Sequence, residues 1–146
     1  MKTAAVGRFG VLGIDGIIAA TDPANNAESF KNGPCLSGKT PALETHRGKF
    51  VVLLQPLAAN AIGWAVASGV VPVKVDFTYD GQPFADAKDT DKTALAAGEG
   101  GAAQILWKES GTGTKWALVR LGAFHWPKLV GKLDGDLTQA TGYATM

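Results

Sequence analysis

The clearest hydrophobic pattern of the chain lies in residues 49–77, KFVVLLQPLAANAIGWAVASGVVPVKVDF. Toward its end, in residues 71–77 (VPVKVDF), apolar side chains occupy every second position. A period of two is that of a strand with one buried face, and the glycines and the proline before it mark turns or bends. We therefore expect residues 49–77 to form strand, turn, strand, turn and strand, with no room for a helix.

A second pattern, in residues 104–121, predicts a β-hairpin. Two apolar stretches, QILWKE and KWALVRL, flank the segment SGTGT, whose two glycines suit a tight loop. On the first strand, the alternation places Ile105 and Trp107 on one face. Because both strands carry apolar residues on both faces, the pattern predicts burial on both sides, as in a closed barrel or a sheet covered by a partner.

The rest of the chain predicts an arm before this core and a tail after it. Residues 1–47 hold an extended stretch followed by a poorly periodic one, rich in turn-forming residues. Polar, glycine-rich residues 78–102 connect the two strand patterns. The fold class that follows is all-β, in a single domain. It has an N-terminal arm or loop over residues 1–47, a small β-barrel or sandwich over 48–122, and a short C-terminal tail over 123–146.

Composition and charge argue against several classes of protein. A chain of 146 residues suits one domain, and 14 basic against 13 acidic residues show no basic excess of the kind that nucleic-acid binders carry. Its apolar runs fall short of the roughly 20 residues of a membrane-spanning helix. The opening MKTAAVGRFG lacks the apolar stretch of a secretory signal, and the lone Cys35 excludes an internal disulfide. We expect synthesis in a reducing cytoplasm, with no nucleic-acid or membrane partner.

Residues 33–40, GPCLSGKT, match the G-x-x-x-x-G-K-[ST] pattern of a phosphate-binding loop. That loop requires a buried strand before it and a helix that begins at its Lys-Thr pair. Here the preceding NNAESFKN does not resemble a core strand, and Pro41 disfavours the helical conformation at Thr40. We therefore favour a structural turn, with nucleotide binding through residues 33–40 as a distant alternative.

Two other groups of residues resemble chemical sites without meeting their requirements. Asp86, Asp89 and Asp91 lack the ligand spacing and the closing glutamate of a calcium loop, so they predict a solvated acidic loop. Cys35 and His46 are a conceivable nucleophile and base, but nothing beside the cysteine activates its thiol. The sequence thus predicts no enzyme activity, no metal and no cofactor.

Aromatic and apolar residues at the edges of the core pattern are candidates for contact with a partner. Trp107 and Trp116 flank the hairpin and are expected in the core or at a subunit interface. Trp64 and Trp126 are better candidates for exposed anchors, since tryptophan is enriched at interfaces. The candidate contact residues are Phe9, Val11, Ile14, Trp64, Phe124 and Trp126.

Four segments of the chain carry a resemblance to known proteins. They are RFGVLGIDG at 8–16, LSGKTP and HRGKF within 36–50, GKFVVLLQPLA through SGVVPVKV at 48–75, and AQILWKESGTGTKWALVRLG at 103–122. Together they resemble an uncharacterised family of small β-domain proteins found in tailed bacteriophages and bacterial genomes, similar to structural proteins of the virion. No catalytic site comes with this resemblance, and the tail after Gly122 is not part of it.

The resemblance implies a structural protein of the virion, in the first place a capsid decoration or cement protein. Its partners would be the major capsid protein and further copies of itself, as a trimer or dimer. It would lie on the capsid surface after synthesis in the host bacterial cytoplasm. The alternative is a structural or adhesion module of the tail or fibre, in which an exposed Trp64 or Trp126 would face a sugar or a receptor.

Overall fold

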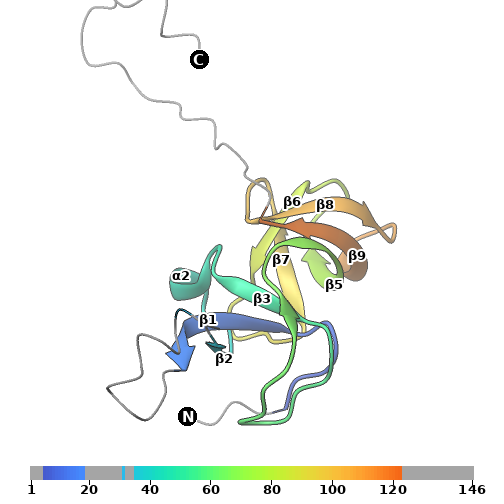
Figure 1. Ribbon diagram of the computed structural model, residues 1–146. Coiled ribbons are helices and arrows are strands. Elements are labelled where there is room, and N and C mark those ends of the chain that lie inside the picture. Colours follow the sequence, from blue (N-terminus) through green and yellow to red (C-terminus); the bar gives the residue numbers. More distant parts are fainter. Residues whose placement is uncertain (1–4, 19–30, 32–34, 123–146) are drawn as a thin grey trace, which may run out of the picture.

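The computed structural model describes residues 5–18, 31 and 35–122, and nearly all of its regular elements are strands. The strands are β1 (Val11–Ile18), β2 (Cys35–Lys39), β3 (Phe50–Leu53), β4 (Ala65–Val66), β5 (Gly69–Phe77), β6 (Phe84–Ala87), β7 (Ala94–Gly98), β8 (Ala103–Lys108) and β9 (Gly113–Leu121), and the helix is α2 (Leu43–His46). The all-β class expected from the sequence is confirmed, and the strands form two groups, a barrel and a smaller sheet (Figure 1).

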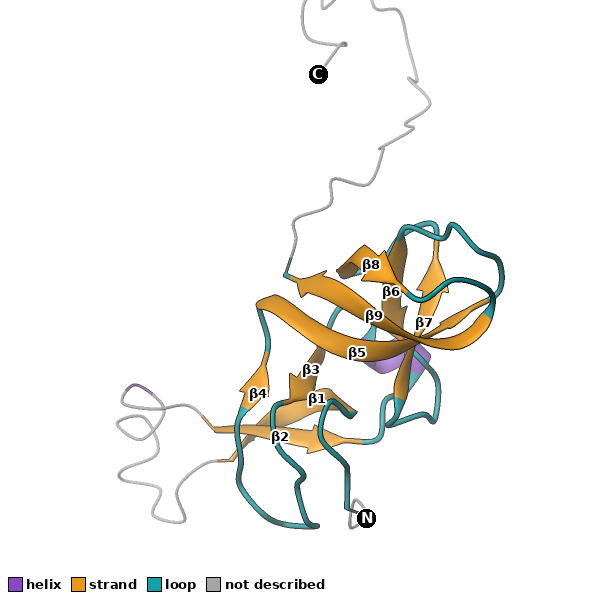
Figure 2. Ribbon diagram, turned by 90° about the vertical axis from the view of Figure 1, so that its right-hand side faces the viewer, coloured by secondary structure: helices purple, strands orange, loops and turns teal. Residues whose placement is uncertain are grey.

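Strands β5 to β9 close into a barrel in the order β5-β7-β6-β8-β9. Antiparallel pairing of β5 with β9 along their whole length closes it, while β5 and β7 run parallel. Figure 2 shows the long strands β5 and β9 side by side. The series strand, turn, strand, turn, strand in residues 49–77 is confirmed as β3, β4 and β5.

The barrel interior is filled by alternating residues of its strands. On β5, Val71, Val73, Val75 and Phe77 are all buried, as their period of two predicts. The neighbouring strands contribute mainly small side chains to the same core: Ala85, Ala87, Ala103 and Ala117. A barrel of only five strands has a narrow interior, so alanine opposite valine fills it without strain.

The hairpin expected in residues 104–121 is present as β8 and β9, with one irregularity on β8. The pairing register shifts between Ile105 and Trp107, where a β-bulge inserts Leu106 as an extra residue. Ile105 therefore packs against the core while Trp107 points outward and is 59% exposed. The expectation that these two side chains share a face is wrong, because the bulge reverses the alternation between them.

The remaining strands form a four-stranded sheet in the order β2-β1-β3-β4. One face of this sheet packs on the barrel through Val11, Phe50 and Val52, so the two parts share one core. The barrel itself spans β5 to β9 rather than residues 48–122, and residues 11–18 and 35–39 form strands rather than an arm. The physical reason is that β1 is apolar on both faces, and such a strand is stable only when it is paired and covered.

The half-buried carboxylate of Asp86 links the sheet region to the barrel. Oδ1 of Asp86 on β6 accepts hydrogen bonds from the backbone N–H groups of Gly48 at 2.7 Å and Ala87 at 2.8 Å. Its Oδ2 accepts one from the N–H of Ala102 at 3.3 Å. Hydrogen bonds to a charged acceptor are the stronger kind, so Asp86 fixes the loop before β3 and the loop before β8 onto the barrel.

An ion-pair cluster connects β5 to the loop between β6 and β7. The ammonium of Lys88 lies 3.2 Å from both the Asp76 and the Asp91 carboxylates. These two carboxylates raise the pKa of Lys88. Burial acts to raise the pKa of Asp91, but hydrogen bonds from Thr93 and Lys88 outweigh it, and the pKa lies below its ordinary value of 3.8.

Acid should therefore destabilise the protein through Asp91. Its pKa is lower in the folded chain than in the unfolded chain, so the stabilisation is present above about pH 4 and is lost as the pH falls through the folded value. We expect the temperature of the unfolding midpoint to decrease as the pH is lowered from about 5 to about 3. The Asp91→Asn variant should be less stable at pH 6 and show a smaller fall. An equal fall in both proteins would assign the acid sensitivity to other groups.

Candidate interaction surface

The face of the four-stranded sheet that points away from the barrel is apolar. Neighbouring residues on β1 and β3 alternate between the two faces: Val11 and Val52 belong to the barrel core, whereas Leu12, Val51 and Leu53 form a second cluster. Among residues 5–18, 31 and 35–122, no second sheet or helix packs over this cluster. The residues before β1 and the long connection from β3 to β4 cover it, so that Leu12, Val51 and Leu53 are at most 8% exposed.

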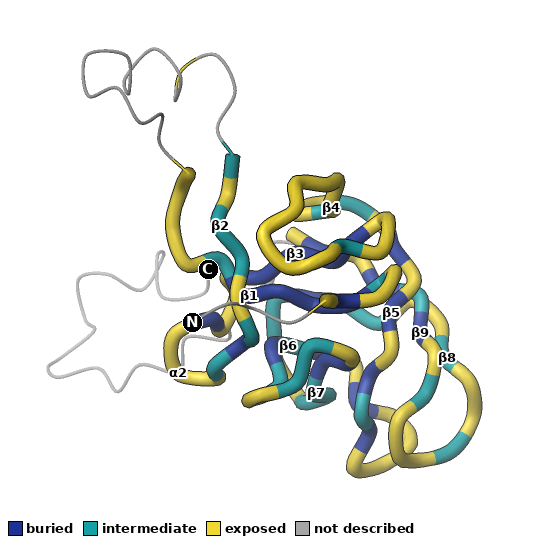
Figure 3. The backbone as a smooth tube through the Cα atoms, turned by 90° about the horizontal axis from the view of Figure 1, so that it is seen from below, coloured by how far each residue is buried: buried dark blue, intermediate teal, exposed yellow. Residues whose placement is uncertain are grey.

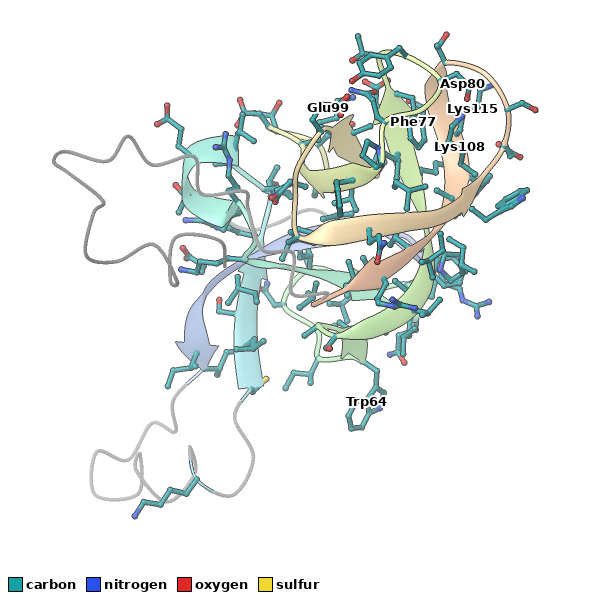
Figure 4. All side chains as sticks on the ribbon, turned by 90° about the horizontal axis from the view of Figure 1, so that it is seen from above. Trp64, Phe77, Asp80, Glu99, Lys108 and Lys115 are labelled. Atoms are coloured by element: carbon teal, nitrogen blue, oxygen red, sulfur yellow. The ribbon has the colours of Figure 1, made fainter. Side chains whose placement is uncertain are left out.

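The connection from β3 to β4, residues 54–64, shapes one wall of a groove over this face. Leu57 pairs with Val6 through two backbone hydrogen bonds, of 2.9 and 2.8 Å, which hold the connection against the sheet. Beyond this anchor, Ile62 and Trp64 are each 76% exposed. Figure 4 shows Trp64 pointing outward, on the side of the molecule far from Phe77 and Lys108.

The groove has a volume of about 920 Å³, and no charged side chain of the described residues lines it. Its floor is made by β1 and β3, one wall by residues 55–65, and the other wall by Ile18 and residues 35–38. Its polar lining consists of neutral groups such as Ser37, Gln55 and Asn60. In a chain with 27 charged residues, an uncharged lining of this size favours an apolar, uncharged occupant. We call this feature the sheet groove.

The far ends of strands β1 and β2 extend beyond the body of the molecule (Figures 3 and 4). At their far end, Ile17, Ile18 and Leu36 are 48%, 54% and 45% exposed. An ion pair of 2.6 Å between Lys39 and Asp15 ties the two strands together near the register shift between Ile14 and Gly16. The hydrogen bond from Lys39 lowers the pKa of Asp15. The two-stranded ribbon thus presents exposed apolar side chains on a paired backbone.

The structure places the expected contact residues in different environments. Trp64 lies at the rim of the sheet groove and Ile14 is half-buried in its lining. Val11 is fully buried in the core, so it stabilises the fold and is not available to a partner. Phe9 is half-buried and contacts the ring of Trp116 at 6.1 Å. Phe124 and Trp126 lie outside the described residues.

Trp107 and Trp116 are not core residues. Trp107 is 59% exposed and Trp116 is 38% exposed, both on the outer face of the barrel. Of the two locations that the sequence suggested for them, core or subunit interface, the structure excludes the core. Ile62, Ile18 and Leu36 were missed by the sequence reasoning, because an exposed apolar residue has no periodicity that separates it from a buried one.

The described part of the nucleotide-binding pattern, residues 35–40, belongs to a sheet and the bend after it, and residues 33 and 34 lie outside the described residues. Residues 35–39 are the edge strand β2, and Lys39 pairs with Asp15 rather than standing free over a loop. The helix that follows, α2, is only four residues long and begins at Leu43, beyond Pro41. Backbone N–H groups of an extended strand do not converge on one point, so this part of the chain does not form a phosphate cradle.

The cysteine and the histidine of the conceivable catalytic pair lie apart. The ring of His46 packs on Gly13, where an added Cβ would lie 2.4 Å from the ring. Gly13 pairs with Lys39 at one end of β2, whereas Cys35 is at the other end. Four residues of strand separate those ends by about 13 Å, too far for proton transfer between the two side chains.

His46 instead has a structural role at the start of α2. It is fully buried, and its Nδ1 accepts a hydrogen bond of 2.8 Å from the N–H of Ala42. No partner for its Nε2 is present in the described part of the chain. Since Nδ1 acts as acceptor, the neutral ring carries its proton on Nε2.

The acidic residues of the predicted solvated loop have protein partners. Asp86 accepts backbone hydrogen bonds, Asp91 binds Thr93 and Lys88, and Asp89 accepts one from the N–H of Leu43 at 3.1 Å. Within residues 5–18, 31 and 35–122, no three histidine, cysteine or acidic side chains are grouped so that they could hold a metal ion. In the same residues, no helix is long and apolar enough to cross a membrane.

Comparisons of the chain with protein-family models, with curated proteins and with solved structures found no match. The surface geometry therefore carries the functional argument.

Proposed function

We propose that this protein is a structural component of a bacteriophage virion, in the first place a decoration or cement protein that stabilises the capsid. The observation that carries the proposal is the sheet groove, an uncharged apolar surface with Ile62 and Trp64 at its rim. A groove with a mainly apolar lining and exposed apolar residues at its rim is typical of protein–protein contact. The resemblance of residues 8–16, 48–75 and 103–122 to phage structural proteins supports the choice of a virion.

The proposed action is mechanical rather than catalytic. Copies of the protein would bind one another and the major capsid protein through the sheet groove and the β1–β2 ribbon, as trimers or dimers of closed symmetry. Burial of an exposed isoleucine or tryptophan contributes about 1.5–3 kcal/mol. Because a shell contains many identical contacts, even this modest gain per subunit stabilises the whole particle.

Purified particles test this proposal directly. A decoration protein should be present in hundreds of copies on the outer surface of the head, judged from gel band intensity and from labelled antibodies in electron micrographs. Heads that lack the protein should lose their DNA on mild heating. A few copies located on the tail, with intact heads that fail to attach to the host, would contradict capsid decoration and support the tail or fibre module, in which the exposed Trp64 would contact a receptor or sugar.

Serine in place of both Ile62 and Trp64 should abolish incorporation into particles. The two side chains together provide at least about 3 kcal/mol on burial, so the affinity should fall more than about a hundredfold. Incorporation is measured by adding purified protein to heads that lack it. Tyr79→Ser is the matched control, since this aromatic is 49% exposed but lies on the turn after β5 and does not line the sheet groove. Equal binding by both variants would exclude the groove as the contact.

A further inference from the structure

A second exposed surface, on the outer side of the barrel, differs in chemistry from the sheet groove. Pairing aligns Pro72 of β5, Leu118 of β9 and Trp107 of β8 in one row across three strands. Trp107 and Pro72 are exposed and Leu118 is half-buried, so the row is an apolar strip open to solvent. We call the outer side of β5, β9 and β8 the barrel face.

Cations border this apolar strip on both sides. Lys74 pairs with Trp116 in the neighbouring row, and its ammonium lies 5.4 Å from the centre of the indole ring. On the other side of the strip, Arg120 projects outward from β9 and is exposed. Neither Lys74 nor Arg120 forms an ion pair with any residue that the structure describes.

The residues before β1 add a third cation to the barrel face. The ring of Phe9 contacts Trp116 edge to face, and the guanidinium of Arg8 lies 4.5 Å from the centre of the Phe9 ring. Two acidic residues lie on or beside this face, and both are already engaged. The carboxylate of Glu109 accepts a hydrogen bond of 3.0 Å from the N–H of Trp116, and Asp76, in the outer row of β5, forms an ion pair with Lys88. The barrel face therefore carries an excess of positive charge although the whole chain has a net charge of only +1.

We propose that the barrel face binds an acidic surface of a different protein, with an apolar centre and carboxylates around it. The apolar strip supplies a surface that excludes water, and Lys74, Arg120 and Arg8 are placed to contact carboxylates around it. This proposal does not depend on a role in the virion.

Two other occupants fit the barrel face less well. A second copy of the chain would bring Lys74, Arg120 and Arg8 against like charges, which opposes association. A single-stranded nucleic acid stacks successive bases on several open aromatic faces, but Trp116 is already engaged by Lys74 and Phe9, and Trp107 alone would offer one such face. Repulsion between like charges does not arise at the uncharged sheet groove, so a second copy of the chain can bind there. The two surfaces therefore suit different partners.

The proposal is tested with two synthetic peptides that share a leucine–phenylalanine centre. One is flanked by aspartate and glutamate, the other by lysine. Binding to the full chain is followed by tryptophan fluorescence and by calorimetry at low and high salt. We expect the acidic peptide to bind, the lysine peptide not to bind, and the affinity for the acidic peptide to fall as salt is raised. Equal binding of the two peptides would overturn the proposal.

A charge reversal on the barrel face separates a local effect from net charge. The double variant Lys74→Glu with Arg120→Glu should lose about tenfold or more in affinity for the acidic peptide and should prefer the lysine peptide. The matched control, Arg47→Glu with Lys49→Glu, changes net charge equally in exposed residues outside this face and should retain the native preference. An equal loss in the control would show that only net charge matters and would overturn the proposal.

The apolar strip and the nucleic-acid alternative are tested with the same assay. Trp107→Ser should weaken the acidic peptide at both salt concentrations while leaving the thermal midpoint of the free protein nearly unchanged, because the side chain is 59% exposed. An unchanged affinity would mean that no apolar contact exists. If an oligothymidylate bound more tightly than the acidic peptide, and if charge reversal abolished its binding, the barrel face would be assigned to nucleic acid instead.

Discussion

The Gly101→Ala variant should lose about 3 kcal/mol or more of stability, a large part of the total for a domain of this size. A Cβ at position 101 would lie 2.3 Å from the carbonyl oxygen of Ala85 and 2.7 Å from its carbonyl carbon. Those atoms are backbone of β6, which is paired with β7 and β8 inside a closed barrel, so they cannot move aside as a side chain would. Overpacking against such a neighbour separates β6 from β8. Urea unfolding followed by circular dichroism measures the loss.

Gly100→Ala is the matched control for this prediction. It adds the same methyl group one residue away, where no heavy atom lies within 4 Å. Its stability should change by less than about 0.5 kcal/mol. If both variants lost the same stability, the cause would be a general stiffness of the 98–101 turn, and the close approach of Gly101 to Ala85 would not explain the effect.

The sequence predicts well those strands in which one face is buried along the whole strand and the other is exposed. In β5 the buried and exposed positions alternate strictly, because one face fills the barrel and the other meets solvent or a partner. The hairpin of β8 and β9 is predictable for the same reason and because glycines mark its loop. Local pattern is sufficient where burial changes with the period of the strand.

Prediction from sequence is poor where burial depends on segments that meet only in the fold. Strand β1 is half buried and half exposed along its length, so its pattern resembles an irregular arm. Strand β2 has no fully buried residue, since it lies at the edge of the sheet. The bulge at Leu106 leaves no signal in composition, yet it reverses the side of Trp107.

The same distinction applies to the candidate interaction surfaces. The exposure of Trp64 could be anticipated, because it stands outside the alternating pattern between glycines and small residues. The sheet groove could not, since β1, β2 and residues 54–64 form it together from three parts of the chain. The barrel face also depends on register, which aligns Pro72, Leu118 and Trp107 only once β5, β9 and β8 are paired.

Phe77→Ala should destabilise the protein by about 3–5 kcal/mol, the usual cost of deleting a fully buried aromatic ring. Phe77 is 2% exposed and fills one end of the barrel. The ammonium of Lys108 lies 4.6 Å from the centre of its ring and also donates hydrogen bonds of 3.0 Å to the carbonyl oxygens of Glu109 and Gly111. An ion pair with Asp80 completes this arrangement (Figure 4). Removal of the ring therefore leaves a cavity beneath a cation that is largely shielded from water.

Trp107→Ala provides the comparison that makes this test decisive. It removes a larger ring from the same barrel but from its exposed outer face, so the loss should stay below about 1 kcal/mol. Phe77→Leu, which retains most of the volume, combined with Lys108→Met in a double-mutant cycle isolates the contact between ring and cation. We expect a coupling energy of about 0.5–1 kcal/mol. A coupling near zero would mean that Phe77 acts only by filling space, and that Lys108 is held by Asp80 and the two carbonyl groups alone.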